Sequence, residues 1–167
     1  MQSIFETERL VVRRYTPGDK EKFFSLNGDE EVVRFIRAVQ TKEESDRFLE
    51  ENISFYDEEP LMGRWAVQEK SSGSFVGSFA IIFIPGSKEI QLGYALLKNE
   101  WGKGYATELV KAGLQYVFNT MKLPFVFAVT EKENTGSQHV LLKAGFKMEK
   151  EYTEGEKELF RFIIYTP

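Results

Sequence analysis

A change in hydrophobic periodicity near residue 100 most constrains the fold of this 167-residue chain. Three runs rich in β-branched and aromatic residues precede it, and glycine- or serine-rich turns separate them; the runs are 65–68, 75–84 and 89–97. After it, apolar residues recur at helical spacing from 105 to 121, and a buried-strand run follows at 125–129. This order predicts an α/β (α+β) fold with antiparallel hairpins first and a strand–helix–strand unit late.

Further strands and helices are predicted at both ends of the chain. Residues 8–15 form a first strand, and Asp19 is placed to cap a helix after it. Residues 41–44 have the sequence of a capping box that opens a second helix. A short helix at 136–144 is expected to end at Gly145 in a left-handed C-cap, before two last strands.

Length and composition exclude several classes of protein. We expect residues 1–167 to form one domain, because no linker or repeat divides them. A net charge of −4 argues against a nucleic-acid partner and favours cationic partners through steering. No stretch is long and apolar enough for a signal peptide or membrane span, so we expect a cytoplasmic protein without a membrane partner. With no cysteine and a single histidine, we expect neither a thiolate nucleophile nor a metal site.

The segment 99–108 joins a strand to the strongest predicted helix. Free backbone N–H groups and the positive dipole end lie there, and Gly102 and Gly104 let the backbone approach a ligand. The pattern is not a P-loop, because Gly104 follows Lys103 where serine or threonine is required. It is not a dinucleotide fingerprint either, because Thr107 stands where glycine is needed. Spacing alone leaves a phosphate site and an ordinary helix-capping turn equally open.

The same segment resembles motif A of the GNAT superfamily of N-acetyltransferases. The usual Gln/Arg-x-x-Gly-x-Gly/Ala is matched here as Trp101-x-x-Gly104-x-Ala106, after Leu-Gly-Tyr-Ala-Leu-Leu at 92–97. Tryptophan at the first position departs from the general pattern and is similar to the ribosomal-protein N-terminal acetyltransferase (RimJ/RimL-like) branch. That branch commonly opens with a segment like Thr-Glu-Arg-Leu-Val-Val-Arg at 7–13. It also carries something like Asn-x-x-Ser at 134–137, followed by Lys-Ala-Gly-Phe, so the resemblance covers essentially the whole chain.

The resemblance implies a GNAT fold, in which a mixed, mostly antiparallel twisted sheet splays open at the acetyl-coenzyme A cleft, with flanking helices. Pantetheine would pair with the strand that ends near residue 97, as an added strand would. Pyrophosphate would lie on the amides of 102–107. The expected coenzyme contacts are Leu96, Leu97, Trp101, Gly102, Lys103, Gly104, Tyr105, Ala106, Thr107, Asn134 and Ser137. For Asn134 and Ser137, simple capping of the short helix is the local alternative.

The acid and the base of the reaction are poorly marked in the sequence. Many family members place a tyrosine acid where Leu141 stands, so Ser137 is the next candidate to hydrogen-bond the leaving sulfur. The position that often carries a glutamate base is Gln91. Glu89 lies on the same strand face and can act through water, and Glu151 is an alternative. A solvated surface carboxylate is the competing interpretation for both glutamates.

Together these observations predict an N-acetyltransferase that uses acetyl-coenzyme A and no metal. Without cysteine, direct attack by a primary amine in a ternary complex is favoured over an acyl-enzyme. The acceptor is a protein N-terminus or a small-molecule amine, and the resemblance implies a homodimer as a common assembly. The alternatives are a non-catalytic acyl-coenzyme A sensor or scaffold, a longer acyl donor, or a plain interaction domain.

Overall fold

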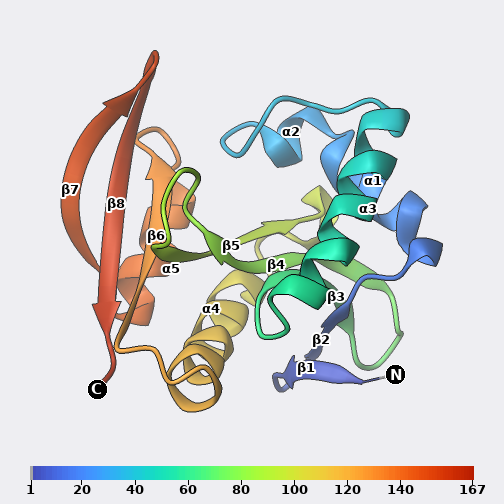
Figure 1. Cartoon of the computed structure of the whole chain (residues 1–167), viewed down its shortest axis with the longest axis horizontal. Helices are drawn as coiled ribbons and strands as arrows, with labels where there is room; N and C mark the ends of the chain where they lie inside the picture. The colour runs from blue at the N-terminus through green and yellow to red at the C-terminus, as the bar shows by residue number, and fades with distance from the viewer. Residues whose placement is uncertain (1) are drawn as a thin grey trace.

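The computed structural model describes residues 2–167 and is built on an eight-stranded sheet in the order β1-β2-β3-β4-β5-β6-β8-β7 (Figure 1). The strands are β1 (Ser3–Glu6), β2 (Leu10–Arg14), β3 (Gly63–Glu69), β4 (Phe75–Phe83), β5 (Ile90–Leu96), β6 (Phe125–Glu131), β7 (Lys147–Glu154) and β8 (Lys157–Tyr165). The helices are α1 (Lys20–Asn27), α2 (Glu30–Val33), α3 (Lys42–Glu58), α4 (Tyr105–Gln115) and α5 (Thr135–Ala144). Neighbouring strands are antiparallel except β5 and β6, which are parallel and joined through α4. The predicted mixed sheet with flanking helices is confirmed.

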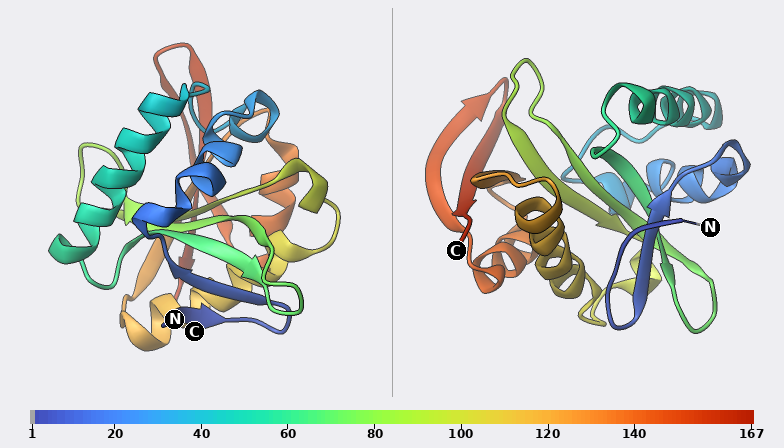
Figure 2. Two further views of the ribbon diagram at one scale, coloured as in Figure 1. Left: turned by 90° about the vertical axis from the view of Figure 1, so that its right-hand side faces the viewer. Right: turned by 60° about the horizontal axis from the view of Figure 1, so that its bottom comes forward.

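The helices cover both faces of the sheet (Figure 2). On one face, Trp65 and Val67 of β3 belong to the main core with Leu109 of α4. On the other face, Ala66 packs in a second cluster with Leu49 of α3. The period of two along β3 therefore sends alternate residues into two separate layers. Among the described residues 2–167, no helix combines the length and apolarity that a membrane crossing requires.

The sheet opens between β5 and β6. The two strands are joined by one registered pair, Gln91 opposite Phe127. Beyond it β5 stays paired with β4 as far as Leu96, whereas β6 pairs along 125–131 with β8. Figure 1 shows β6 and β8 running in a different direction from β4 and β5. The predicted splay is thus confirmed, and it leaves one edge of β5 without a strand partner.

Local capping signals are observed at two helix ends. Thr41 and Glu44 form the predicted capping box, with the Glu44 N–H 3.2 Å from Thr41 Oγ1 and the Thr41 N–H 3.0 Å from Glu44 Oε1. Gly145 ends α5 at φ +106°, as expected for a left-handed C-cap. The Phe146 N–H then donates to the Leu141 carbonyl at 3.0 Å. This closed end fixes where β7 begins.

Three local features differ from the prediction. The helix predicted to reach residue 121 changes to a π-helical turn at Tyr116–Thr120, where the Met121 N–H donates to the Tyr116 carbonyl at 3.1 Å. The Asp19 side chain does not cap α1; its carboxylate accepts from both Arg13 Nη atoms, at 2.8 and 3.0 Å. A buried guanidinium needs a carboxylate more than a helix end needs a cap, because an unpaired buried charge costs several kcal/mol. The short β1 and α2 were not predicted, since four residues carry too little periodicity.

Candidate active site

The turn before α4 combines two left-handed glycines. Gly102 has φ +78° and Gly104, the N-cap of α4, has φ +82°, a region that other residues rarely adopt. No side chain caps α4, and its first intrahelical bond is donated by Glu108 to the Gly104 carbonyl. The preceding N–H groups of the first turn therefore have no helical partner. With the positive end of the helix dipole, they form a site suited to a phosphate group.

Trp101 ties this turn to the free edge of β5. The Leu97 N–H donates to the Val76 carbonyl of β4 at 2.9 Å, so strand alternation turns the backbone groups of Leu96 and Tyr94 toward the opening. The Trp101 indole Nε1–H donates to the Leu96 carbonyl at 2.9 Å. It therefore satisfies one of these carbonyls and leaves the Leu96 N–H facing the opening. This contact is a physical reason for tryptophan at the position where the general family pattern has Gln or Arg.

The N-terminal segment holds the same turn from the other side. Arg9 donates through Nη2 to the Lys103 carbonyl and through Nε to Glu108 Oε1, both at 2.9 Å. The Thr7 hydroxyl donates to Glu108 Oε2 at 2.5 Å. Burial opposes ionisation of Glu108, but the hydrogen bonds from Thr7 and Arg9 prevail and lower its pKa. The Thr-Glu-Arg segment thus contributes a charged clamp on the glycine turn.

One cavity of about 600 Å³ lies over the glycine turn. Most of the predicted coenzyme contacts line it, namely Leu96, Trp101, Gly102, Gly104, Tyr105, Ala106, Thr107, Asn134 and Ser137. Leu97 and Lys103 lie outside its lining. Leu97 is bonded to β4, and Lys103 Nζ is paired with Glu100 Oε2 at 2.8 Å. A diphosphate with a long amide-bearing arm fits here, because the turn offers N–H groups and β5 offers a strand edge.

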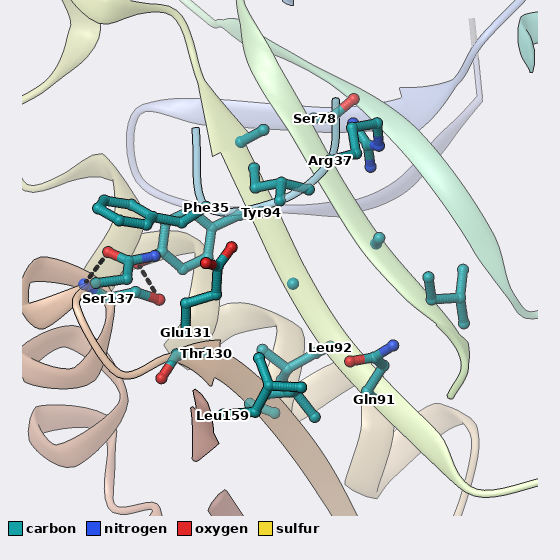
Figure 3. Close-up of a pocket in the computed structure, with 18 of the residues that line it drawn as sticks. Phe35, Arg37, Ser78, Gln91, Leu92, Tyr94, Thr130, Glu131, Ser137 and Leu159 are labelled. Carbon is teal, nitrogen blue, oxygen red and sulfur yellow. Dashed lines mark hydrogen bonds between the residues drawn. The ribbon is translucent and has the colours of Figure 1, made fainter. Parts of the chain in front are cut away.

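A second cavity of about 640 Å³ occupies the opening between β5 and β6 (Figure 3). Its lining includes Ala128–Glu131 of β6 and Gln91–Ala95 of β5. Both cavities share the residues Phe35, Ile36, Tyr94, Ala95, Asn134 and Ser137. The two spaces therefore meet at the N-terminus of α5, as two substrates that react with each other require.

The hydroxyls of Tyr94 and Ser137 meet at this junction. The Tyr94 O–H donates to Ser137 Oγ at 3.3 Å, and burial raises the Tyr94 pKa although the Ser137 contact opposes the shift. Asn134 Oδ1 accepts the Ser137 backbone N–H at 3.3 Å, so Asn134 caps α5 while facing both cavities. The Ser137 hydroxyl is left to face the junction. Leu141 is a buried part of the wall, and the phenol at the junction is that of Tyr94 on β5.

The predicted carboxylates lie away from the junction. Glu89 stands outside both cavities, half-exposed, with its Oε1 3.0 Å from Arg161 Nη1. Glu151 is also exposed and lies 3.4 Å from Lys132 Nζ. The competing interpretation of both as surface carboxylates agrees with this placement. The structure offers no support for a proton relay through Glu89.

Glu131 at the end of β6 is the acidic side chain that the sequence reasoning missed. It lines the second cavity, and Figure 3 shows it near Tyr94 and Ser137. Within residues 2–167, its buried Oε2 has no hydrogen-bond donor, and the Lys157 Nζ is 3.6 Å away. The sequence feature that could have identified Glu131 is its position two residues beyond the buried-strand run at 125–129. Among residues 2–167, no group of three His, Cys, Asp or Glu side chains is suited to hold a metal ion.

Comparison with known proteins agrees with this geometry. A family model described as the acetyltransferase (GNAT) domain matches residues 9–147. The uncharacterized N-acetyltransferase YoaA of Bacillus subtilis is 26% identical over 152 residues, covering 89% of this chain and 85% of YoaA. Two solved structures superimpose over nearly the whole chain. A GNAT-family acetyltransferase from Bacillus anthracis is 25% identical with a TM-score of 0.84, covering 96% of both chains. RimL, a ribosomal L7/L12 α-N-protein acetyltransferase bound to coenzyme A, is 13% identical with a TM-score of 0.82, covering 98% of both chains.

The chain belongs to the GNAT family of acetyltransferases. It is an acyltransferase, and its acyl-carrying co-substrate is acetyl-coenzyme A.

Replacing Gly104 tests the phosphate site. Gly104→Val forces a β-branched residue into φ +82°, which costs about 1–3 kcal/mol or moves the turn. We expect the calorimetric affinity for coenzyme A to fall at least about tenfold. Gly86→Val is the matched control, because Gly86 has φ +77° in the turn between β4 and β5, lines neither cavity and has no atom within 4 Å of an added Cβ. Equal coenzyme affinity in the two variants would contradict the assignment.

Proposed function

We propose that this acetyltransferase moves an acetyl group from acetyl-coenzyme A directly to the amine of an acceptor held in the second cavity. The observation that carries the proposal is the junction at Tyr94 and Ser137, where the two cavities meet. RimL is by its name an α-N-protein acetyltransferase, which makes a primary amine the natural acceptor class. The acceptor amine belongs to a peptide N-terminus or a small molecule, and residues 1–167 act as one catalytic domain.

Coenzyme A is proposed to lie in the first cavity. Its pyrophosphate rests on the amides of 102–107. Arg9 and Glu108 hold this turn in place. Its pantetheine extends along β5, where the backbone of Tyr94 and the Leu96 N–H are free to pair. The thioester then lies at the junction. Of these groups the Leu96 N–H pairs with pantetheine, and the Tyr94 N–H, which faces the opening at the junction, is positioned to stabilise the carbonyl oxygen as it gains charge.

The chemistry needs one base and one hydrogen-bond donor. The amine nitrogen attacks the acetyl carbon and forms the C–N bond, while its proton passes to Glu131, directly or through water. The C–S bond breaks, and the sulfur takes the proton of the Ser137 hydroxyl, which Tyr94 replaces. The proton held by Glu131 returns through solvent to Tyr94, so the enzyme is restored. A thiol has a pKa of about 8.5, so the leaving group needs only mild assistance. The products are an acetamide and free coenzyme A.

Two-substrate kinetics tests the proposed function. We expect acetyl-coenzyme A and a panel of primary amines to give free thiol with intersecting double-reciprocal lines, because the chain has no cysteine to carry the acetyl group. The rate should rise with pH as the amine loses its proton. Parallel lines or an acetylated protein in intact-mass spectra would contradict direct transfer. Coenzyme binding without turnover of any amine would favour a sensor.

Ser137→Ala tests the donor at the leaving sulfur. We expect kcat to fall roughly tenfold, equivalent to about 1.4 kcal/mol, with little change in the KM for acetyl-coenzyme A. The melting temperature should hold, because Asn134 and not the Ser137 hydroxyl caps α5. Thr135→Ala, at the exposed first residue of the same helix, is the control and should retain kcat. An unchanged kcat in Ser137→Ala would remove Ser137 from the reaction.

Glu131→Gln tests the base. We expect kcat/KM to fall about a hundredfold at neutral pH, because the amide cannot accept the proton of the amine. The deficit should shrink as the pH approaches the pKa of the acceptor amine, where deprotonation no longer needs help. Glu89→Gln, which removes only an exposed ion pair with Arg161, should stay within about twofold of the wild type. A larger loss of kcat/KM in Glu89→Gln than in Glu131→Gln would identify Glu89 as the base.

A further inference from the structure

Two arginines of the second cavity lack a charge partner. Arg37 follows α2 and Arg64 lies on β3, and both line the cavity in the opening between β5 and β6. Within residues 2–167, neither guanidinium has a carboxylate within salt-bridge distance. The buried Arg13 behaves differently, because it is held by both oxygens of Asp19. Arg37 and Arg64 are therefore not explained by the ion pairing that supports the fold.

The two guanidinium groups pack on one aromatic ring and have unused donors. The Cζ atoms of Arg37 and Arg64 lie 5.2 and 4.7 Å from the centre of the same Phe48 ring. Arg37 Nη1 donates to Asn27 Oδ1 at 2.7 Å. The Arg64 side chain donates no hydrogen bond to the described residues, although its backbone is tied to Asn52. An aromatic face attracts cations but accepts no fork of N–H bonds, so these donors remain for a ligand.

This pair of like charges is costly to the folded protein. Burial lowers the pKa of Arg37, and burial followed by the charge of Arg37 lowers the pKa of Arg64 to about 10. Both side chains still carry their charge at neutral pH. Unpaired, desolvated charges in a cavity are typical of a binding site, because an anionic ligand relieves the repulsion when it binds.

The other charges of the cavity complement this pair. Figure 3 shows Arg37 beside Ser78 of β4, while Glu131 lies on the β6 side near Tyr94 and Ser137. Glu154 and Lys157 of the C-terminal hairpin also line the cavity. Strand alternation puts Arg64 on the same sheet face as Ala66, which packs against α3. The positive pair therefore lies on the β4 side, apart from the proposed reaction site.

We propose that the acceptor is a small amine that also carries an anionic group, a carboxylate or a phosphonate. The anion binds between Arg37 and Arg64, while the amine reaches Glu131 and the thioester. A cavity of about 640 Å³ has room for a molecule of this size. The inference rests on the proposed function and specifies its substrate class. It departs from the expectation that the net negative charge favours cationic acceptors. The acceptor contacts the charged side chains that line the cavity, and two of these are arginines without a counter-ion.

Matched pairs of acceptors test this inference. In each pair a neutral group replaces the anionic group: 4-aminobutanoate with 4-aminobutanamide, glycine with glycinamide, and 2-aminoethylphosphonate with ethanolamine. The anionic group also raises the pKa of a nearby amine, so kcat/KM is expressed per concentration of free amine in each comparison. We expect kcat/KM to be at least about tenfold higher for the anionic member of at least one pair, through a lower KM. Arg64→Gln and Arg37→Gln should bring the ratio of kcat/KM for the anionic member to kcat/KM for the neutral member towards one. Arg64→Lys, which keeps the charge without the planar fork, should retain part of it.

Arg47→Gln is the matched control, because Arg47 is exposed on α3 next to Phe48 and lines neither cavity. It should keep the full ratio. The melting temperature of Arg64→Gln should equal or exceed that of the wild type, because the variant removes an unpaired charge. A purely structural arginine would instead lower the melting temperature and leave the ratio intact. Equal kcat/KM within every pair would overturn the inference.

Binding without turnover separates this inference from the proposed function. Calorimetry on protein loaded with coenzyme A measures the affinity for each anionic amine and its neutral partner. We expect tighter binding of an anionic member and loss of that difference in Arg64→Gln. If no amine is acetylated but this Arg64-dependent difference is seen, the proposed function fails and the anion site stands. Equal affinities within every pair overturn the anion site even if acetylation is observed.

Discussion

The parting of β5 from β6 after one registered pair is the constraint on which the rest of the structure depends. A strand whose outer edge has no partner strand must leave its backbone groups to another partner or to a ligand. Because α4 is the next helix after β5 and α5 is the next helix after β6, both helix N-termini are brought to the same opening. Two cavities and their junction follow from this one topological feature.

The glycine turn is effective only because it is held in place. Glycines at positive φ are flexible in isolation, and an anion site that must first be ordered binds weakly. Here the Trp101 indole holds one end on β5, and Arg9 with Glu108 holds the other. The N-terminal segment and the glycine turn, about a hundred residues apart, thus form one structural unit.

Charge is used in two ways in this protein. Arg13 and Asp19 are buried as a bidentate pair, in which each ion compensates the desolvation of the other. Arg37 and Arg64 share an aromatic ring but no counter-ion, and the buried Oε2 of Glu131 accepts no hydrogen bond from the described residues, with Lys157 Nζ 3.6 Å away. Groups left unsatisfied in this way are a cost to stability, and here they lie together in the cavity. The first arrangement supports the fold, and the second is suited to binding and proton transfer.

The sequence by itself determined the strands other than β1, the principal helices, the capping box at Thr41 and the left-handed cap at Gly145, and its motifs indicated the family. These features depend on side-chain period and on backbone preferences of neighbouring residues, which are local. Only the tertiary structure decided that Tyr94 meets Ser137, that Glu131 and not Glu89 faces the junction, and that two arginines share the acceptor cavity. Which side chain is left without a partner depends on packing between distant segments, and no local pattern encodes that.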